Sequence, residues 1–262
     1  MSDTDDAPVG RILTRREILA LLGGSGAALF AACAPAAVRG TPSPTSATAS
    51  STAASTAAAS AIVATPNCIV VPALTEGPYF VDEKLSRSDI RSDPTDGSVK
   101  PGAALTLALN ISRASSGACS GLAGATVDVW HCDALGVYSD ASDPGFNTKG
   151  SKFLRGYQTT DSGGNVQFTT IYPGWYQGRA VHIHFKIRTP ATNASYDFTS
   201  QFFFDDPFTD QVYAQAPYSQ KGSGRLRDSG DSIYTGGGDK LLLPVTKSGS
   251  GYAAAFAIGL AI

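Results

Sequence analysis

The stretch from residue 180 to 188 alternates apolar and polar side chains, which restricts it to a β-strand with two different faces. Its apolar positions are Val181, Ile183, Phe185 and Ile187. Because successive side chains of a strand point to opposite faces, His182 and His184 share the other face. They are two of the three histidines in the chain. Two imidazoles on one side of a strand suit a metal ion. The alternative is an exposed polar face that continues through Lys186.

Other segments with strand-like patterns predict an all-β domain. The candidate strands span residues 103–111, 126–132, 165–171, 181–188, 199–204, 240–245 and 252–258. Turn-rich stretches separate them, and 262 residues with 42% hydrophobic content are enough for a normal core. The sequence therefore predicts a β-sandwich. A short helix is expected over 205–213, capped by Asp205 or Asp206.

The N-terminal residues 1–33 are typical of an export signal rather than of structure. Arg15 and Arg16 precede a weakly apolar segment that is too short to span a bilayer stably. This pattern predicts export by the twin-arginine route, to the outside of the cell or to a lipid anchor at the cell surface or periplasmic side. Residues 29–33 resemble a lipoprotein cleavage box, which predicts a lipid on Cys33. Ordinary cleavage with Cys33 unmodified is the alternative.

Residues 34–66 are almost entirely Ala, Ser, Thr and Pro, with Arg39 as the only charge. Such a segment cannot bury enough apolar surface to fold, so we expect a disordered, flexible tether. The folded domain is then expected over 67–262. A formal net charge of −2 argues against a nucleic-acid partner, which needs a strong basic excess.

Three cysteines follow the tether: Cys68, Cys119 and Cys132. In an exported protein a disulfide is expected, and three cysteines leave one unpaired. Cys119 lies in a Gly/Ser-rich stretch just before the strand with Cys132, so the sequence favours the pair Cys119–Cys132. The pair Cys68–Cys132 is the main alternative.

Two tyrosines lie next to the predicted strands in positions that allow them to join the histidines. Tyr176 belongs to the turn that leads into the histidine strand, and Tyr138 follows the strand 126–132. Oxygen and imidazole donors without nearby thiolates favour a harder ion such as iron. A trivalent cation removes the phenol proton at neutral pH. For an isolated tyrosine, packing or hydrogen bonding is the ordinary role.

Four motifs then occur in a fixed order along the chain. They are Gly124-Ala-x-Val127-x-Val129-Trp130-His-Cys-Asp133-Ala-x-Gly136-x-Tyr138, Arg155-Gly-x-x-x-Thr160-Asp161, Phe168-x-Thr170-Ile171-x-Pro173-Gly-x-Tyr176 and Arg179-x-x-His182-Ile-His184-Phe185. Together they resemble the intradiol ring-cleavage dioxygenases, which include catechol 1,2- and protocatechuate 3,4-dioxygenases. Residues 75–80 are similar to a Gly-Pro-aromatic segment near the pocket of that family.

The resemblance implies a non-haem Fe(III) enzyme with a β-sandwich of the intradiol dioxygenase type. Its implied metal ligands are Tyr138, Tyr176, His182 and His184. Arg179, Tyr176 and Gln201 are implied as catalytic residues, and Tyr79 as a pocket residue that contacts the substrate together with Arg179 and Gln201. The implied substrates are a small catechol-type aromatic diol and O2. The aromatic ring would be cleaved between its two hydroxyl groups to give a cis,cis-muconate-type product.

Departures from the family pattern leave alternatives open. Only Gln177 and Gly178 separate Tyr176 from Arg179, where familiar members have a longer loop, and the N-terminal helical region of catechol 1,2-dioxygenases is replaced by signal and tether. His131 has no matching ligand role and is expected to be structural. A transthyretin-like or carboxypeptidase-regulatory-like sandwich is the alternative without catalysis, although its pattern does not require the histidine motif. A divergent iron protein without ring cleavage is a third hypothesis.

Overall fold

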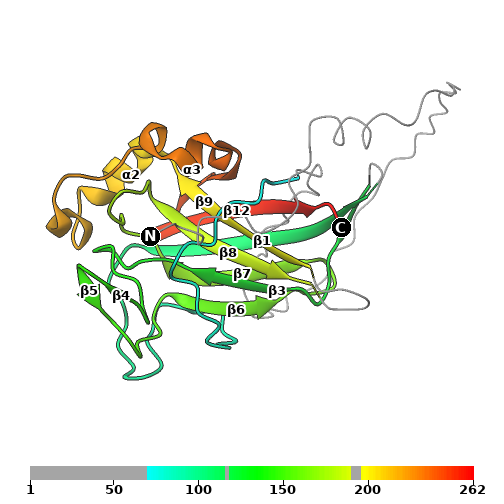
Figure 1. Cartoon of the computed structure of the whole chain (residues 1–262), viewed down its shortest axis with the longest axis horizontal. Helices are drawn as coiled ribbons and strands as arrows, with labels where there is room; N and C mark the ends of the chain where they lie inside the picture. The colour runs from blue at the N-terminus through cyan, green and yellow to red at the C-terminus, as the bar shows by residue number, and fades with distance from the viewer. Residues whose placement is uncertain (1–69, 116–117, 190–195) are drawn as a thin grey trace, which may run out of the picture.

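The computed structural model describes residues 70–115, 118–189 and 196–262. Several predicted features lie outside the described residues: the signal with Arg15, Arg16 and Cys33, the tether 34–66, and Cys68. The described part of the chain folds into two β-sheets that pack face to face, with short helices gathered at one end (Figure 1). The fold is a β-sandwich, as the sequence predicts.

The first sheet is built around its longest strand, β1 (Ala104–Ser115). β12 (Gly251–Leu260) runs parallel to β1 on one side, and β11 (Thr246–Ser248) extends the sheet beyond β12. On its other side β1 pairs antiparallel with both β7 (Asn165–Ile171) and β2 (Ala118–Gly121). The last strand of the chain therefore lies inside the sheet rather than at its edge.

The second sheet carries the histidine pair at its centre. Its strands, in spatial order, are β10 (Leu242–Leu243), β9 (Asp197–Phe204), β8 (His182–Arg188), β3 (Thr126–Trp130) and β6 (Arg155–Thr159). β8 is antiparallel to both β3 and β9. The register places His184 between Trp130 and Gln201. Residues far apart in the sequence thus meet on one face of this sheet.

Apolar residues at alternate strand positions fill the space between the two sheets. They include Leu105, Leu107, Leu109 and Ile111 of β1 and Ile183, Phe185 and Ile187 of β8. Phe202 of β9 stacks on Phe185 with ring centroids 4.3 Å apart, and it also contacts Phe256 of β12 at 5.2 Å. Burial at about 25 cal/mol per Å² of apolar surface makes this layer the main source of stability.

The outer face of the second sheet is also buried at the histidine pair. His182 and His184 are each 3% exposed. The segment that precedes β1 crosses this face, where the Leu74 backbone N–H donates to the Thr199 carbonyl (3.0 Å) and Gln201 Nε2 donates to the Thr75 carbonyl (2.7 Å). The alternative of a solvent-exposed polar strand face is therefore wrong at these positions.

Short helices lie between β9 and β10 in the chain and gather at one end of the sandwich (Figure 1). They are α2 (Asp206–Tyr213), η2 (Tyr218–Lys221), η3 (Asp228–Gly230), α3 (Ser232–Thr235) and η4 (Gly238–Leu241). The predicted cap is present, because Asp205 accepts a hydrogen bond from the Phe208 N–H at 2.8 Å. The hairpin of β4 (Ser142–Asp143) and β5 (Phe146–Asn147) lies toward the same end. Within the described ranges, no helix has the length and apolar character needed to cross a membrane.

The predicted strand over 240–245 is mostly absent. The chain instead forms the 3-10 turn η4 and the two-residue strand β10. Gly238 packs so closely on the Phe203 ring that a Cβ there would lie 2.4 Å from it. This contact favours a compact turn over an extended chain. The sequence also missed β2, β4, β5, β6 and β11, which are short and lack an alternating apolar pattern.

The predicted disulfide Cys119–Cys132 is wrong. Cys132 is a free, buried thiol that lies against the Gly174 carbonyl at 3.3 Å, so the alternative pair Cys68–Cys132 is wrong as well. Cys119 is disulfide-bonded. The reason is topological: Cys119 belongs to β2 in the first sheet, whereas Cys132 follows β3 in the second sheet.

Candidate active site

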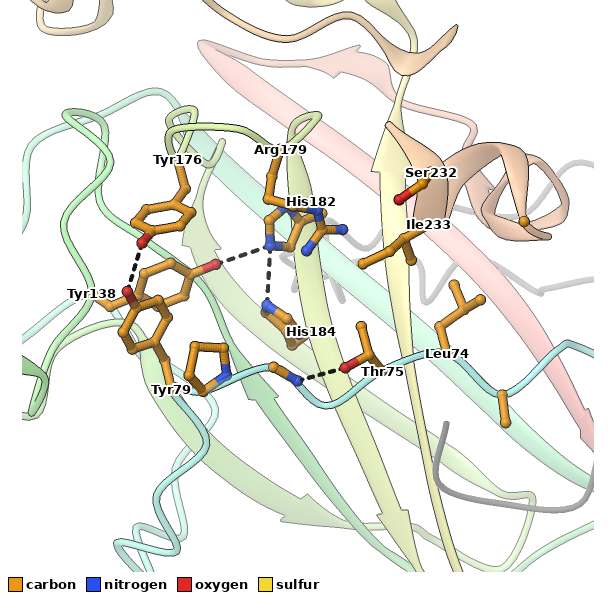
Figure 2. A pocket seen from close by; sticks show the side chains of 14 residues that line it. Leu74, Thr75, Tyr79, Tyr138, Tyr176, Arg179, His182, His184, Ser232 and Ile233 are labelled. Carbon is orange, nitrogen blue, oxygen red and sulfur yellow. Dashed lines mark hydrogen bonds between the residues drawn. The ribbon is translucent and has the colours of Figure 1, made fainter. Parts of the chain in front are cut away.

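The histidine pair brings two ring nitrogens together on the outer face of the second sheet. His182 Nε2 and His184 Nε2 lie 3.0 Å apart, and the two rings meet edge to face (Figure 2). β8 places both side chains on one face, as the alternation in the sequence predicts. Trp130 on the neighbouring strand β3 stacks on the His184 ring. The sheet register and this stack therefore fix where the two nitrogens point.

Both histidines are neutral at physiological pH. Burial lowers the pKa of His182 to about 3, and the positive charge of Arg179 adds to the effect. Burial likewise lowers the pKa of His184 well below its ordinary value. His182 Nδ1 lies 2.7 Å from the Ala180 carbonyl, which assigns its proton to Nδ1 and leaves Nε2 with a free lone pair. Neutral imidazole is the form that binds metals.

Tyr138 reaches the same point from the turn that follows β3. Its hydroxyl lies 3.0 Å from His182 Nε2, to which it donates, and the side chain is 1% exposed. The turn is held by Asp133 Oδ1, which accepts the Val137 N–H at 3.0 Å. Gly136 has φ +79°, and a Cβ there would lie 2.2 Å from the Trp175 carbonyl oxygen. Only glycine allows the Tyr138 turn to approach the Tyr176 turn so closely.

Tyr176 lies in the same cavity, but its hydroxyl makes different contacts. It lies 2.7 Å from the Tyr79 hydroxyl, and both phenols donate to Asp143 Oδ2, Tyr79 at 2.6 Å and Tyr176 at 2.7 Å. The Tyr138 and Tyr176 rings stand edge to face with centroids 5.7 Å apart (Figure 2). Three of the four expected ligands, Tyr138, His182 and His184, therefore lie together. The Tyr176 hydroxyl lies in the same cavity but contacts Tyr79 and Asp143 instead.

Asp143 is a site residue that sequence reasoning missed. It comes from β4 and holds two cavity tyrosines through one oxygen. Its hydrogen bonds, first of all the one from Tyr79, lower the pKa of the carboxyl group below its ordinary value. Burial raises the pKa of Tyr176, and the hydrogen bond to Asp143 contributes to the rise. In this arrangement Asp143 is ionised and Tyr176 is a neutral phenol.

Arg179 and Gln201 form a second polar group, on the other side of the histidines. Arg179 Nη2 donates to Gln201 Oε1 at 2.6 Å, and Arg179 Nε donates to Asp231 Oδ2 at 2.9 Å. Gln201 is fully buried and donates from Nε2 to the Thr75 carbonyl. The structure thus brings the two residues together as the resemblance implies. It also adds Asp231, which sequence reasoning missed.

These groups surround a cavity of about 520 Å³. It is lined by Ala73, Leu74, Thr75, Gly77, Pro78, Tyr79, Tyr138, Tyr176, Arg179, His182, His184, Ser232, Ile233 and Gly236. The tyrosines lie on one side and residues of α3 lie on the other (Figure 2). Gly77, with φ +71°, lies close to His184: a Cβ at this position would be 3.2 Å from the imidazole Cε1. The cavity is large enough for a drug-sized ligand.

The donor set fits a metal ion. His182 Nε2 offers one lone pair, yet both the Tyr138 hydroxyl and His184 Nε2 point at it from 3.0 Å. His184 Nδ1 is buried without a hydrogen-bond partner. A cation at the meeting point would accept all three donor atoms at once, and the Ala180 carbonyl already orients the His182 ring. No group of three or more His, Cys, Asp or Glu side chains in the described ranges could hold a metal ion, so tyrosine oxygens must complete such a site.

His131, the third histidine, lies outside the cavity lining. Its Nδ1 contacts the Cys132 carbonyl at 2.8 Å and its Nε2 contacts Thr170 Oγ1 at 2.7 Å. Both ring nitrogens are thus occupied within the protein. This placement agrees with the structural role that the sequence predicts.

Comparison with known proteins decides the family. The protein family described as Dioxygenase matches residues 75–228, which is more than half of the chain. An intradiol ring-cleavage dioxygenase of known structure from Tetranychus urticae is 29% identical, with a TM-score of 0.65 over 74% of this chain and 95% of that chain. The chain belongs to the intradiol ring-cleavage dioxygenase family. Its β-sandwich matches the solved structures of this family.

Two further proteins that this chain resembles show how far the similarity extends. The dioxygenase domain of a dioxygenase–carbohydrate-binding fusion protein from Streptomyces sp. SirexAA-E is 27% identical, with a TM-score of 0.54 over 74% of this chain and 99% of that chain. The chlorocatechol 1,2-dioxygenase of Pseudomonas putida is 31% identical across 32% of this chain. That match spans 36% of the relative's length. The transthyretin-like alternative receives no support from these relatives.

Proposed function

We propose that this protein is a non-haem Fe(III)-dependent dioxygenase that inserts O2 into a catechol-type aromatic diol. The ring would open between the two hydroxyl-bearing carbons and give a cis,cis-muconate-type diacid. One observation carries the proposal: the Tyr138 hydroxyl and His184 Nε2 each lie 3.0 Å from His182 Nε2 at the wall of the cavity. Membership of the intradiol family supports the reaction type.

His182, His184 and Tyr138 would hold the iron, with Tyr176 as a fourth ligand. When bound, ferric iron supplies Lewis-acid activation of the aromatic diol toward O2. The phenol of Tyr138 is buried, and burial raises its pKa well above the ordinary value. Its ionised form therefore needs a cation beside it, which a trivalent metal provides.

The group formed by Tyr176, Tyr79 and Asp143 is suited to holding a proton taken from the substrate. A Tyr176 phenolate is basic enough to accept a proton from a diol hydroxyl. The neutral phenol that results has two partners ready, since Tyr79 and the Asp143 carboxylate both lie within 2.7 Å of its oxygen. These contacts support Tyr176 as the proton acceptor and Tyr79 as a residue of the substrate pocket.

Arg179 is the charged side chain best placed to stabilise negative charge that develops on the substrate. It is the only charged residue among the described residues that line the cavity. Gln201 and Asp231 hold two of its nitrogens, so its orientation is set before substrate arrives. A preorganised guanidinium near the reacting atoms lowers the barrier without reorganisation during the reaction.

The far wall of the cavity favours a substrate with an uncharged ring substituent. Ala73, Leu74 and Ile233 make this wall apolar, and Arg179 is already engaged by a carboxylate. A carboxylate on the ring would find no free cation here and would be costly to bury. A cavity of about 520 Å³ has room for more than one small ring. We therefore place alkyl-, aryl- or halogen-substituted catechols ahead of protocatechuate.

The direct test is product analysis after reaction of the iron-loaded protein with catechol and 4-methylcatechol under ¹⁸O2. The proposal predicts oxygen uptake and a muconate-type diacid that carries both labelled atoms. An iron-loaded protein that consumes no oxygen with any catechol would support the divergent iron protein without ring cleavage. A ring-opened aldehyde product would contradict intradiol cleavage.

Export belongs to the same proposal. Arg15 and Arg16 with the apolar segment that follows them predict a twin-arginine signal, and residues 34–66 predict a tether. We propose that the folded domain acts outside the cytoplasm, either released or held by a lipid on Cys33. Replacement of Arg15 and Arg16 by Lys should block export, and replacement of Cys33 by Ser should release the protein from membranes only if the cysteine carries a lipid.

A further inference from the structure

Asp231 is a buried carboxylate, 2% exposed, at the start of α3. Its Oδ1 accepts hydrogen bonds from the Ile233 N–H at 2.8 Å and the Tyr234 N–H at 3.3 Å. These contacts form an ordinary helix cap. A helix of four residues does not need a fully buried carboxylate for this purpose, and the second oxygen of Asp231 makes contacts that a cap does not explain.

Asp231 Oδ2 points away from the helix, toward the start of the histidine strand. It accepts from Arg179 Nε at 2.9 Å and from the Ala180 N–H at 2.8 Å. The carbonyl of the same Ala180 accepts from His182 Nδ1 at 2.7 Å. One carboxylate oxygen is therefore bonded directly to Arg179 and, across a single residue, linked to the ring of His182.

The surroundings of Asp231 keep it ionised. Burial alone would raise the pKa of this carboxyl group, but the Arg179 charge and the N–H donors of Ala180 and Ile233 lower it below its ordinary value. A charge-assisted pair between a buried carboxylate and a half-buried guanidinium has a defined geometry and is costly to break from one side. Arg179 has no comparable anion elsewhere among its described contacts.

We propose that Asp231 is a positioning residue that fixes the Arg179 guanidinium and the His182 ring relative to each other. The inference rests on the proposed function, because Arg179 and His182 are assigned there to charge stabilisation and metal binding. Asp231 is not among the residues that line the cavity, so it would act through these two residues. It also ties α3, whose Ser232 and Ile233 line the cavity, to the start of β8.

The test uses Asp231→Asn in the full-length, iron-loaded protein. Asn keeps an oxygen for the cap, but its amide N–H groups would oppose the N–H donors of Arg179 and Ala180. We expect kcat and kcat/KM for catechol to fall together by roughly 10–100-fold, the range for loss of such supporting contacts. Asp205→Asn is the matched control, because Asp205 caps α2 without touching the cavity. Its turnover should stay within about two-fold of wild type.

A double-mutant cycle separates positioning from folding. In the background Arg179→Met, Asp231→Asn should cause a clearly smaller further loss of kcat than it causes in the wild type, because one of the two residues that Asp231 positions is gone. Additive losses, or equal losses in the Asp231 and Asp205 variants, would overturn the inference. Asp231→Glu, which keeps the charge, should recover part of the activity. If Asp231→Asn does not fold, the same double-mutant cycle is measured with Asp231→Glu and Arg179→Met. Additive losses of kcat in that cycle would likewise overturn the inference.

A second readout does not depend on turnover. In metal-free protein, the Arg179 Nε–H resonance, assigned by its absence in Arg179→Met, should exchange slowly with solvent in wild type and rapidly in Asp231→Asn. Unchanged protection in Asp231→Asn would contradict the inference even if activity fell. Wild-type protein without any ring cleavage would instead refute the proposed function, while the exchange result would still report on Asp231.

Discussion

The indole ring of Trp130 lies flat on the imidazole of His184, with ring centroids 4.9 Å apart and an interplanar angle of 8°. Trp130 is buried, and its Nε1 has no hydrogen-bond partner. The indole therefore contributes its face and its volume rather than a polar contact. Together with Gly77 on another side of the imidazole, it keeps the His184 ring from turning.

Replacement of Trp130 by Ala should loosen this ring. We expect a loss of about 3–5 kcal/mol in the free energy of unfolding, because a large buried ring leaves a cavity. Iron affinity, measured by competition with a chelator, should fall by roughly 10–100-fold. Trp130→Phe keeps an aromatic face and loses no hydrogen bond, so its iron affinity should remain close to wild type. Equal iron affinity in the Ala variant and wild type would contradict the stacking role.

Asp143 should matter for turnover through the phenols of Tyr79 and Tyr176. Asp143→Asn removes a charged acceptor that both hydroxyls use, and a hydrogen bond to a charged group is worth about 1.5–3 kcal/mol. We expect kcat to fall by roughly 10–100-fold. Asp140→Asn is the control, since Asp140 lies on the same loop and accepts from the Gly150 N–H instead. If both variants turn over equally fast, the phenol–carboxylate group has no role in catalysis.

The apolar wall should set substrate preference. In wild type, kcat/KM should be at least about 100-fold higher for 4-methylcatechol than for protocatechuate, because the ring carboxylate would be buried without a free cation. Ile233→Arg offers that cation and should narrow the ratio by roughly 10-fold, whereas Ile233→Met should not. A wild-type preference for protocatechuate would show that this wall does not face the ring substituent.

His131 should make the protein less stable in acid. Burial lowers its pKa in the folded state to about 4, against about 6.5 in an unfolded chain. Between these values the unfolded state takes up the proton first, so the free energy of unfolding decreases as pH falls. The contribution of His131 is about 1.4 kcal/mol per pH unit, or roughly 3 kcal/mol from pH 6.5 to 4. The free energy of unfolding of His131→Gln, measured with urea at several pH values in this range, should depend on pH less steeply than that of the wild type, by about 1.4 kcal/mol per pH unit. An unchanged dependence on pH would contradict the assignment.

The sequence predicts the sandwich and much of the site because these depend on local patterns. Alternation alone places His182 and His184 on one face, and the order of motifs adds Tyr138, Tyr176 and Arg179. The structure brings these side chains into one cavity. Asp205 is also recognisable as a helix cap, because its contact lies three residues away in the sequence.

Asp143 and Asp231 are not predictable in this way. Their contacts to Tyr176 and Arg179 join residues 33 and 52 positions apart, and nothing in their local sequence distinguishes them from other carboxylates. The disulfide failed for a related reason: nearness in sequence suggested Cys119–Cys132, while the strand order places the two residues in different sheets. The hydroxyl of Tyr176 likewise takes its partners from distant segments.

The visible absorption spectrum of purified, iron-reconstituted protein tests the central claim most directly. If Tyr138, His182 and His184 hold ferric iron, a tyrosinate-to-iron charge-transfer band should colour the protein red-brown at an iron content near one per chain. Tyr138→Phe should remove or shift the band and lower the iron content. A colourless wild-type protein that retains no iron after reconstitution would contradict the account.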